Sequence, residues 1–177
     1  MSLLDVAVVL LAVLGLVNLA LVLTVIHRLR TGTTSEPAHF GPPQLPVGSK
    51  APEFSAVTTV GQPRSLADLL GSRSLVGFFS PGCHPCHAQL PEFARVAKTI
   101  PGGASQVLAV VVGEAGDAAE FAVGLDGAAA VVVESRHGPL ADAFSAKAFP
   151  SMYLIGSDGR IEASGVSMQM LADAVPA

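Results

Sequence analysis

Four short apolar runs, separated by segments with a helical pattern, constrain the fold of this chain more than any other feature. The runs are "SLVGFFS" (residues 74–80), "QVLAVVV" (106–112), "AAAVVVE" (128–134) and "SMYLIGS" (151–157). Continuous runs of this length, rich in β-branched or aromatic residues, are typical of strands that are buried on both faces of a sheet. We therefore predict a strand over each run.

Segments with helical spacing lie between and after these runs. We predict helices over residues 85–99, 115–123, 139–146 and 168–175. A tight turn at Asp158-Gly159 predicts a hairpin between residues 153–155 and 160–163. Strands that alternate with helices in this order predict an α/β domain, in which a central mixed sheet carries helices on both faces.

An apolar segment near the N-terminus predicts a membrane anchor. Residues 3–26, "LLDVAVVLLAVLGLVNLALVLTVI", are nearly all Leu, Val and Ala. A helix of this length spans a hydrocarbon core of about 30 Å. No Lys or Arg precedes the segment, and it is longer than the apolar region of a secretory signal, so we expect an uncleaved transmembrane helix rather than a removed signal peptide.

This anchor divides the predicted protein into three parts. Residues 1–30 form the transmembrane anchor and its basic flank, residues 31–46 a flexible Pro/Gly/Thr linker, and residues 47–177 the folded domain. The net charge is −4, and the basic residues are scattered rather than gathered into a stripe. We therefore exclude nucleic acid as a partner.

The segment "CHPCH", from Cys83 to His87, matches two chemically different motifs. C-x-x-C-H is the signature of c-type haem attachment, whereas C-x-x-C is that of a redox dithiol. Cys83 follows a predicted strand and begins a predicted helix, where backbone N–H groups and the helix dipole stabilise a thiolate. Cys86 lies one turn further in, on the shielded side, which favours an attacking thiol at Cys83 and a resolving thiol at Cys86.

Haem and zinc fit the surrounding sequence less well. Haem needs an apolar pocket and commonly a second axial ligand, for which the Met candidates are Met152, Met168 and Met170. Structural zinc needs four ligands, and the remaining histidines, His27, His39 and His137, form no second ligand pair. We predict no metal and no other cofactor, and a c-type haem protein stays open as an alternative.

Residues 47–175 resemble the thioredoxin-like redoxins, particularly the membrane-anchored thiol-disulfide oxidoreductases of the TlpA and ResA type. "VGSKAPEF" is similar to the family's opening G-x-x-A-P-x-F, "CHPC" to its dithiol, and "AFPSMYLIGSDGRI" to its P-T-x-F-L-I-D-x-D-G-R-I segment. "FFSPGCHPC" is closest to the methylamine utilisation protein MauD. The resemblance implies a thioredoxin-like fold with Cys83 and Cys86 as the catalytic pair.

The resemblance also implies a substrate-binding segment and two tuning residues. Pro150 corresponds to the family's cis-proline, which faces the dithiol, and a cis bond there exposes the backbone of Phe149 to an extended substrate. His84 and Pro85 lie between the two cysteines. A protonated His84 would stabilise the Cys83 thiolate and make the disulfide a stronger oxidant. His87 is expected to be an exposed residue of the first helical turn.

Three departures from the family pattern leave a redox-inactive, thioredoxin-like binding module open as a further alternative. Gly77 stands where many thioredoxins keep a buried Asp, and Gln89 stands where ResA-like proteins keep a Glu. Gly82 replaces the Trp that usually precedes the first cysteine. A peroxide-reducing, antioxidant activity is not expected, because its P-x-x-x-T/S-x-x-C motif lacks the proline here.

From these features we expect a single-pass cell-membrane enzyme, a protein disulfide oxidoreductase. It would act on protein thiol and disulfide substrates, exchange electrons with a redox partner, and serve the maturation of an exported enzyme or cytochrome. Anchored relatives present this domain outside the cytoplasm, and we expect the same here. Basic residues at 27–30 favour the cytoplasmic side by the positive-inside rule, which is the alternative.

Overall fold

The computed structural model describes residue 5 and residues 10–20, 44–125 and 127–172. The chain divides into two units, Met1–Phe40 and Gly41–Ala177. Residues 10–20 are helical, and no helix among the described residues is both long and apolar enough to span a membrane. The rest of the predicted anchor and residues 31–43 of the predicted linker lie outside the described residues.

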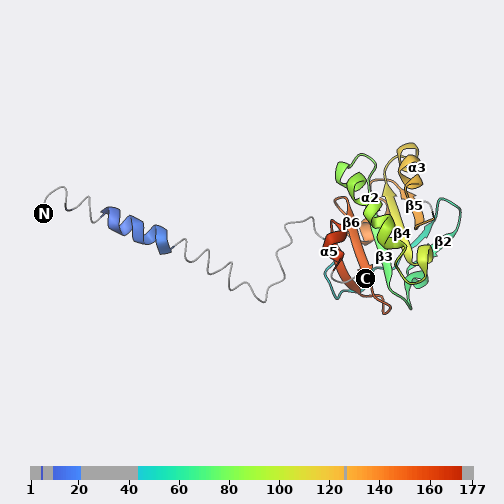
Figure 1. Cartoon of the computed structure of the whole chain (residues 1–177), viewed down its shortest axis with the longest axis horizontal. Coiled ribbons are helices and arrows are strands. Elements are labelled where there is room, and N and C mark those ends of the chain that lie inside the picture. The colour runs from blue at the N-terminus through green and yellow to red at the C-terminus, as the bar shows by residue number, and fades with distance from the viewer. Residues whose placement is uncertain (1–4, 6–9, 21–43, 126, 173–177) are drawn as a thin grey trace. The chain divides into compact units, whose positions relative to one another are not determined.

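The second unit is built on a five-stranded mixed sheet with the strand order β5-β4-β3-β6-β7 (Figure 1). The strands β3, β4 and β5 are parallel, whereas β6 and β7 run antiparallel to their neighbours. Their bounds are Ser74–Phe79 (β3), Val107–Val112 (β4), Ala130–Glu134 (β5), Ser151–Ile155 (β6) and Ile161–Gly165 (β7). The four predicted strands and the predicted hairpin are thus confirmed.

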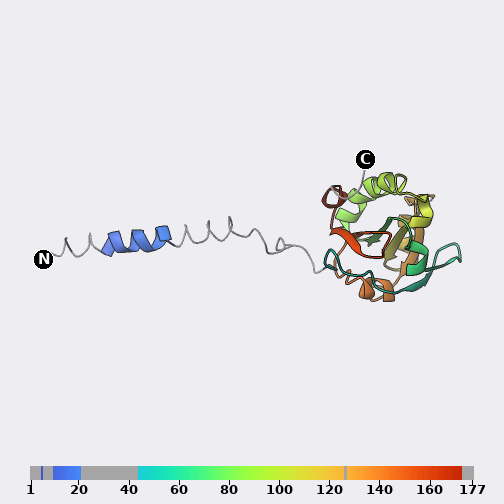
Figure 2. The same cartoon turned by 90° about the horizontal axis from the view of Figure 1, so that it is seen from below.

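Helices cover both faces of this sheet, as the sequence predicts. They are α2 (His84–Ala97), α3 (Ala115–Val123), α4 (Pro139–Ala143) and α5 (Met168–Leu171). Phe93 of α2, Phe121 of α3 and Leu171 of α5 belong to one buried cluster, and Leu140 of α4 belongs to the cluster on the other face. Figure 2 shows α2, in green, and α4, in orange, on opposite sides of the sheet.

Some elements and bounds differ from the sequence prediction. A small antiparallel hairpin of β1 (Ser55–Val57) and β2 (Pro63–Ser65) and two 3₁₀ helices, η1 (Leu66–Leu69) and η2 (Gly103–Gln106), were not predicted. The α4 helix ends at Ala143 rather than at residue 146, because Ser145 has a φ of 53° and leaves the helical conformation. The α5 helix ends at Leu171, and residues 173–175 of its predicted range lie outside the described residues.

Gly77 of the central strand β3 packs against the ring of Phe93 from α2. A Cβ atom at this position would lie 2.6 Å from the ring of Phe93 and 2.8 Å from the ring of Phe79. The two rings meet edge to face with their centroids 5.0 Å apart. The Phe79 and Phe93 rings therefore fill the space that a buried acid at position 77 would need. Their contact also packs α2, the helix that begins at the two cysteines, against β3.

Candidate active site

Cys83 lies at the end of the short turn that connects the central strand β3 to α2. After β3 ends at Phe79, the Cys83 amide donates to the carbonyl oxygen of Ser80 (3.1 Å), and the Cys86 amide donates to that of Cys83 (2.9 Å). Cys83 is the N-cap residue of α2, and Pro85 occupies the first helical turn, where its missing N–H costs nothing. This turn leaves Cys83 partly exposed and Cys86 fully buried.

The environment of Cys86 keeps its sulfur protonated. Burial, followed by the hydrogen bond with the Cys83 thiol, raises the pKa of Cys86 to about 12. The Ser80 amide, 3.5 Å from the Cys86 sulfur, acts in the opposite direction but is outweighed. Within the described part of the chain, no Asp or Glu is among the groups that shift this pKa. Cys86 is therefore a shielded thiol that has to lose its proton before it reacts.

Phe149 and Pro150 lie beside Cys83, although they are distant in the sequence. The Cys83 thiol donates a hydrogen bond to the carbonyl oxygen of Phe149 across 3.2 Å. The Phe149–Pro150 peptide bond is cis, the geometry that the resemblance implies, and Pro150 is buried directly before β6. The structure thus brings together four of the residues expected at the site: Cys83, Cys86, Phe149 and Pro150.

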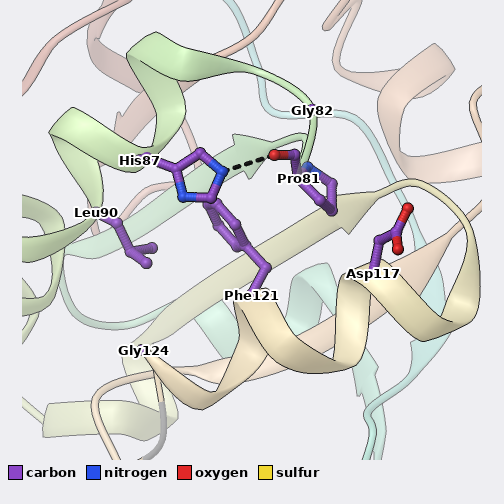
Figure 3. Close-up of a pocket in the computed structure, with 7 residues that line it drawn as sticks. All are labelled: Pro81, Gly82, His87, Leu90, Asp117, Phe121 and Gly124. Atoms are coloured by element: carbon purple, nitrogen blue, oxygen red, sulfur yellow. Dashed lines mark hydrogen bonds between the residues drawn. The ribbon is translucent and has the colours of Figure 1, made fainter.

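The two histidines of the motif have different surroundings. The His84 side chain is exposed and forms no hydrogen bond or ion pair with any described residue, so its tuning role stays a prediction. The His87 ring nitrogen Nε2 lies 2.6 Å from the Pro81 carbonyl oxygen (Figure 3). Its ring also meets that of Phe121 edge to face at 5.0 Å. His87 therefore links the turn before Cys83 to α3, a contact that sequence spacing did not predict.

Gln89 has a structural partner of its own. Its side-chain oxygen Oε1 accepts a hydrogen bond from the Met168 amide across 2.9 Å. Met168 is the first residue of α5, so this bond ties the active-site helix to the C-terminal helix. The position that carries an acid in ResA-like proteins is used here for helix packing.

A pocket of about 430 Å³ opens next to Cys83, between the start of α2 and α3 (Figure 3). Pro81 and Gly82 line it from the turn, and His87 and Leu90 line it from α2. The opposite wall comes from α3 and the residue after it, through Asp117, Phe121 and Gly124. No local sequence pattern predicts this pocket, because residues of two separate helices and the turn before α2 form it.

The zinc and haem alternatives each require a particular arrangement of donor groups. Across the described ranges, no three His, Cys, Asp or Glu side chains gather as a metal site would require. Covalent haem attachment would use both sulfurs and the following histidine. Cys86, in the first turn of α2, is fully buried, and His87 Nε2 is already bonded to the Pro81 carbonyl oxygen. The geometry is that of a dithiol.

A mixed sheet of this order, with a C-x-x-C turn at the start of the helix after its central strand, defines a thioredoxin-like redoxin. Residues 47–164 match the model of the AhpC/TSA family, and the chain belongs to this family.

Individual members of known function or structure are also similar to this chain. It is 28% identical over 121 residues to the thiol-disulfide oxidoreductase ResA of Bacillus subtilis, a match that covers 68% of each chain. Its fold is similar to the thioredoxin domain of a thiol-disulfide oxidoreductase from Bacteroides vulgatus, with 20% identity, a TM-score of 0.63, and coverage of 74% of this chain and 96% of that one. It is likewise similar to a structure described as thiol:disulfide interchange protein DsbE from Chlorobium tepidum, with 24% identity, a TM-score of 0.61, and coverage of 75% and 99%. These matches support a redoxin of the TlpA/ResA type, and the specific resemblance to MauD stays a prediction.

Proposed function

We propose that this protein exchanges disulfides with protein substrates through Cys83 and Cys86. The observation that carries the proposal is the asymmetry of the pair. Cys83 is partly exposed at the start of α2 and bonded to the Phe149 carbonyl, while Cys86 lies buried beneath it as a protonated thiol. An accessible attacking thiol above a shielded resolving thiol is the arrangement that two-step thiol-disulfide exchange requires.

In the first step, the Cys83 thiolate attacks one sulfur of a substrate disulfide. The substrate S–S bond breaks, a mixed disulfide forms on Cys83, and the departing substrate thiolate takes up a proton. The positive end of the α2 helix dipole, at whose N-terminus Cys83 lies, stabilises the attacking thiolate.

In the second step, Cys86 loses its proton and attacks the Cys83 sulfur. This attack releases the second substrate thiol and leaves a Cys83–Cys86 disulfide, so that two electrons pass from the protein to the substrate. A partner that carries a dithiol returns the pair to the reduced state by the same chemistry. In the reverse direction the same residues oxidise a substrate dithiol.

Phe149 and Pro150 are proposed to hold the substrate during this exchange. In the reduced protein, the Phe149 carbonyl oxygen accepts the Cys83 thiol hydrogen. Once Cys83 is part of a mixed disulfide, that hydrogen is gone and the carbonyl is free to accept a backbone N–H from an extended substrate segment. His84 and Pro85, between the two thiols, are proposed to tune the redox potential.

We also propose that residues 1–30 anchor the protein in the cell membrane and that the domain faces away from the cytoplasm. The apolar sequence of residues 3–26 supports the anchor. The proposed role of the protein is in the maturation of an exported enzyme or cytochrome. Protease treatment of intact cells tests the orientation: the domain is expected to be degraded. Protection of the domain would instead support the cytoplasmic orientation that residues 27–30 favour.

Insulin reduction by the purified full-length chain tests the proposed chemistry. With a dithiol reductant present, the wild-type protein is expected to accelerate precipitation of reduced insulin, and Cys83→Ser is expected to abolish the acceleration. The redox potential of the wild-type Cys83/Cys86 pair then shows whether the protein mainly oxidises or reduces its substrates. Known oxidants of this kind have potentials of about −120 mV, and known reductants of about −270 mV. Unchanged activity in Cys83→Ser would overturn the proposal, and a Soret band would favour the haem alternative.

A further inference from the structure

The pocket beside Cys83 lies on the side of the dithiol that Phe149 does not occupy. In the sheet, β3 has β6 on one side and β4 on the other. Phe149 precedes β6, whereas Pro81 packs near Gly113 at the end of β4, where an added Cβ would lie 3.0 Å from the Pro81 ring. Gly82, the residue before Cys83, lines the pocket. A substrate segment that pairs with Phe149 and continues past Cys83 on this side would meet the pocket with its next residues.

The floor of the pocket is aromatic and held in place. Phe121 is 5% exposed, and its ring packs against those of Phe79, at 5.8 Å between centroids, and His87, at 5.0 Å. The His87 ring is in turn held by its hydrogen bond with Pro81. Leu90, partly buried, adds a further apolar surface. A preformed apolar floor of this kind suits a large apolar side chain.

The rim of the pocket is acidic. Asp117 is exposed at the pocket edge and forms no ion pair with any described residue (Figure 3). Glu114, the N-cap residue of the same helix, adds a second exposed carboxylate at this end of α3. No Lys or Arg is among the residues that line the pocket. A ligand that brings a positive charge would find a free counter-ion here.

We propose that this pocket is a substrate subsite that selects a disulfide-bearing segment with a large apolar side chain next to a Lys or Arg. The inference rests on the proposed function, because the selected segment is the one that reacts at Cys83. The apolar side chain contacts Phe121 and Leu90, and the cationic side chain lies over Asp117. The subsite would thereby make disulfide exchange at Cys83 faster with protein substrates that carry such a segment than with those that do not.

Peptide disulfides test this preference with the full-length chain. Two peptides are compared that place Phe-Lys or Phe-Glu beside the reactive cysteine, each joined by a disulfide to the same small chromophoric thiol. The ratio of their kcat/KM values is expected to favour the Lys peptide by about threefold or more, as exposed charge pairs allow. This ratio is expected to shrink in 1 M salt, where the Debye length is about 3 Å.

Variants of the protein test whether Asp117 causes the preference for the Lys peptide. Asp117→Asn is expected to bring the ratio close to one, and Asp117→Lys to invert it. Asp142→Asn removes the same charge from an exposed first-turn position of α4, on the other face of the sheet, and is expected to keep the wild-type ratio. Because an acid in the first turn of α3 also stabilises that helix, the ratio is measured rather than the absolute rate.

A second variant tests the apolar contact. No atom lies within 4 Å of a Cβ placed at Gly82, which lines the pocket, so a side chain can begin there, and Gly82→Trp is expected to obstruct the pocket. The wild-type protein is expected to prefer a Phe peptide over its Phe→Ala analogue, and Gly82→Trp is expected to lose that preference.

The outcomes separate the subsite from the underlying chemistry. Equal kcat/KM values for the Lys and Glu peptides in the wild-type protein, or an Asp117→Asn variant that keeps the wild-type ratio, would overturn the subsite while leaving disulfide exchange intact. Failure of the wild-type protein to exchange with any peptide, and with a small uncharged disulfide, would overturn the proposed function and the subsite with it.

Discussion

The Cys83 thiol and the Phe149 carbonyl oxygen form a hydrogen bond across 3.2 Å, although 66 positions separate the two residues in the chain. This contact joins the turn after β3 to the segment before β6, two antiparallel neighbours in the sheet. It places the partly exposed thiol against a backbone acceptor that is released when Cys83 reacts. The proposed attacking sulfur and the proposed substrate-binding backbone therefore lie side by side.

The buried state of Cys86 predicts that release of the substrate depends on pH. In the reduced protein, burial and the Cys83 hydrogen bond raise the pKa of Cys86 to about 12, so only a small fraction of this thiol is a thiolate at neutral pH. Burial, the larger cause, also acts on Cys86 in the mixed disulfide. The resolving rate is expected to rise about tenfold per pH unit between about pH 7 and 9, in proportion to the thiolate. Rapid acid quenching and mass spectrometry of the mixed disulfide measure it. A rate that is flat over this range would contradict the assignment.

Packing around Gly77 predicts that introducing an acid at this position destabilises the fold. A Cβ there meets the Phe93 and Phe79 rings at 2.6 and 2.8 Å, so Gly77→Ala is expected to lower the free energy of unfolding by about 1–3 kcal/mol through overpacking. Gly77→Asp is expected to cost more, since it also buries a carboxylate. Urea unfolding measures both variants.

The matched control for this experiment is Gly82→Ala. A Cβ at Gly82 has no neighbour within 4 Å, so its free energy of unfolding is expected to change by no more than about 0.5 kcal/mol. Equal stability of Gly77→Ala and Gly82→Ala would show that the contact between α2 and β3 is looser than described.

Tyr153 predicts a loss of stability at alkaline pH. Its buried hydroxyl donates to the Phe144 carbonyl oxygen (2.8 Å), and burial raises the pKa of Tyr153 from its ordinary value of 10.0 to about 12. A raised folded-state pKa gives stability that is complete below about pH 10 and is lost as the pH rises through about 12. Tyr153→Phe is expected to cost about 1 kcal/mol at pH 7, because it leaves the Phe144 carbonyl unpaired.

Unfolding measured from pH 8 to 12 tests this account of Tyr153. The difference in stability between the wild-type protein and Tyr153→Phe is expected to narrow above about pH 10, since only the wild-type protein loses the contribution of the neutral hydroxyl. A difference that stays constant to pH 12 would mean that the hydroxyl is not shielded from water.

The sequence predicted the sheet well because its strands are continuous apolar runs. It did not predict β1 and β2, which have three residues each and include Pro63, a poor strand residue. Such short strands depend on tertiary contacts, among them the hydrogen bond from the Thr59 amide to the Val131 carbonyl oxygen of β5 (2.8 Å). Local pattern carries little information about pairing of this kind.

At the site, too, features that depend on neighbouring residues in the sequence could be predicted, whereas contacts between separate elements could not. The placement of Cys83 at a helix start follows from the local strand-turn-helix pattern, and a helix does begin there. The absence of an acid at position 77 was visible in the sequence, but its reason, the ring of Phe93, lies on another element. The role of His87 likewise depends on Phe121 of α3, and no spacing within the motif indicates it.

Identification of the cysteine that carries the substrate tests the central claim most directly. Full-length Cys86→Ser and Cys83→Ser are each incubated with a peptide disulfide, quenched in acid and digested for mass spectrometry. The account predicts that Cys86→Ser accumulates a mixed disulfide on Cys83, and that Cys83→Ser forms none in the same time because Cys86 is buried and protonated. An adduct on Cys86, or no adduct on Cys83, would contradict it.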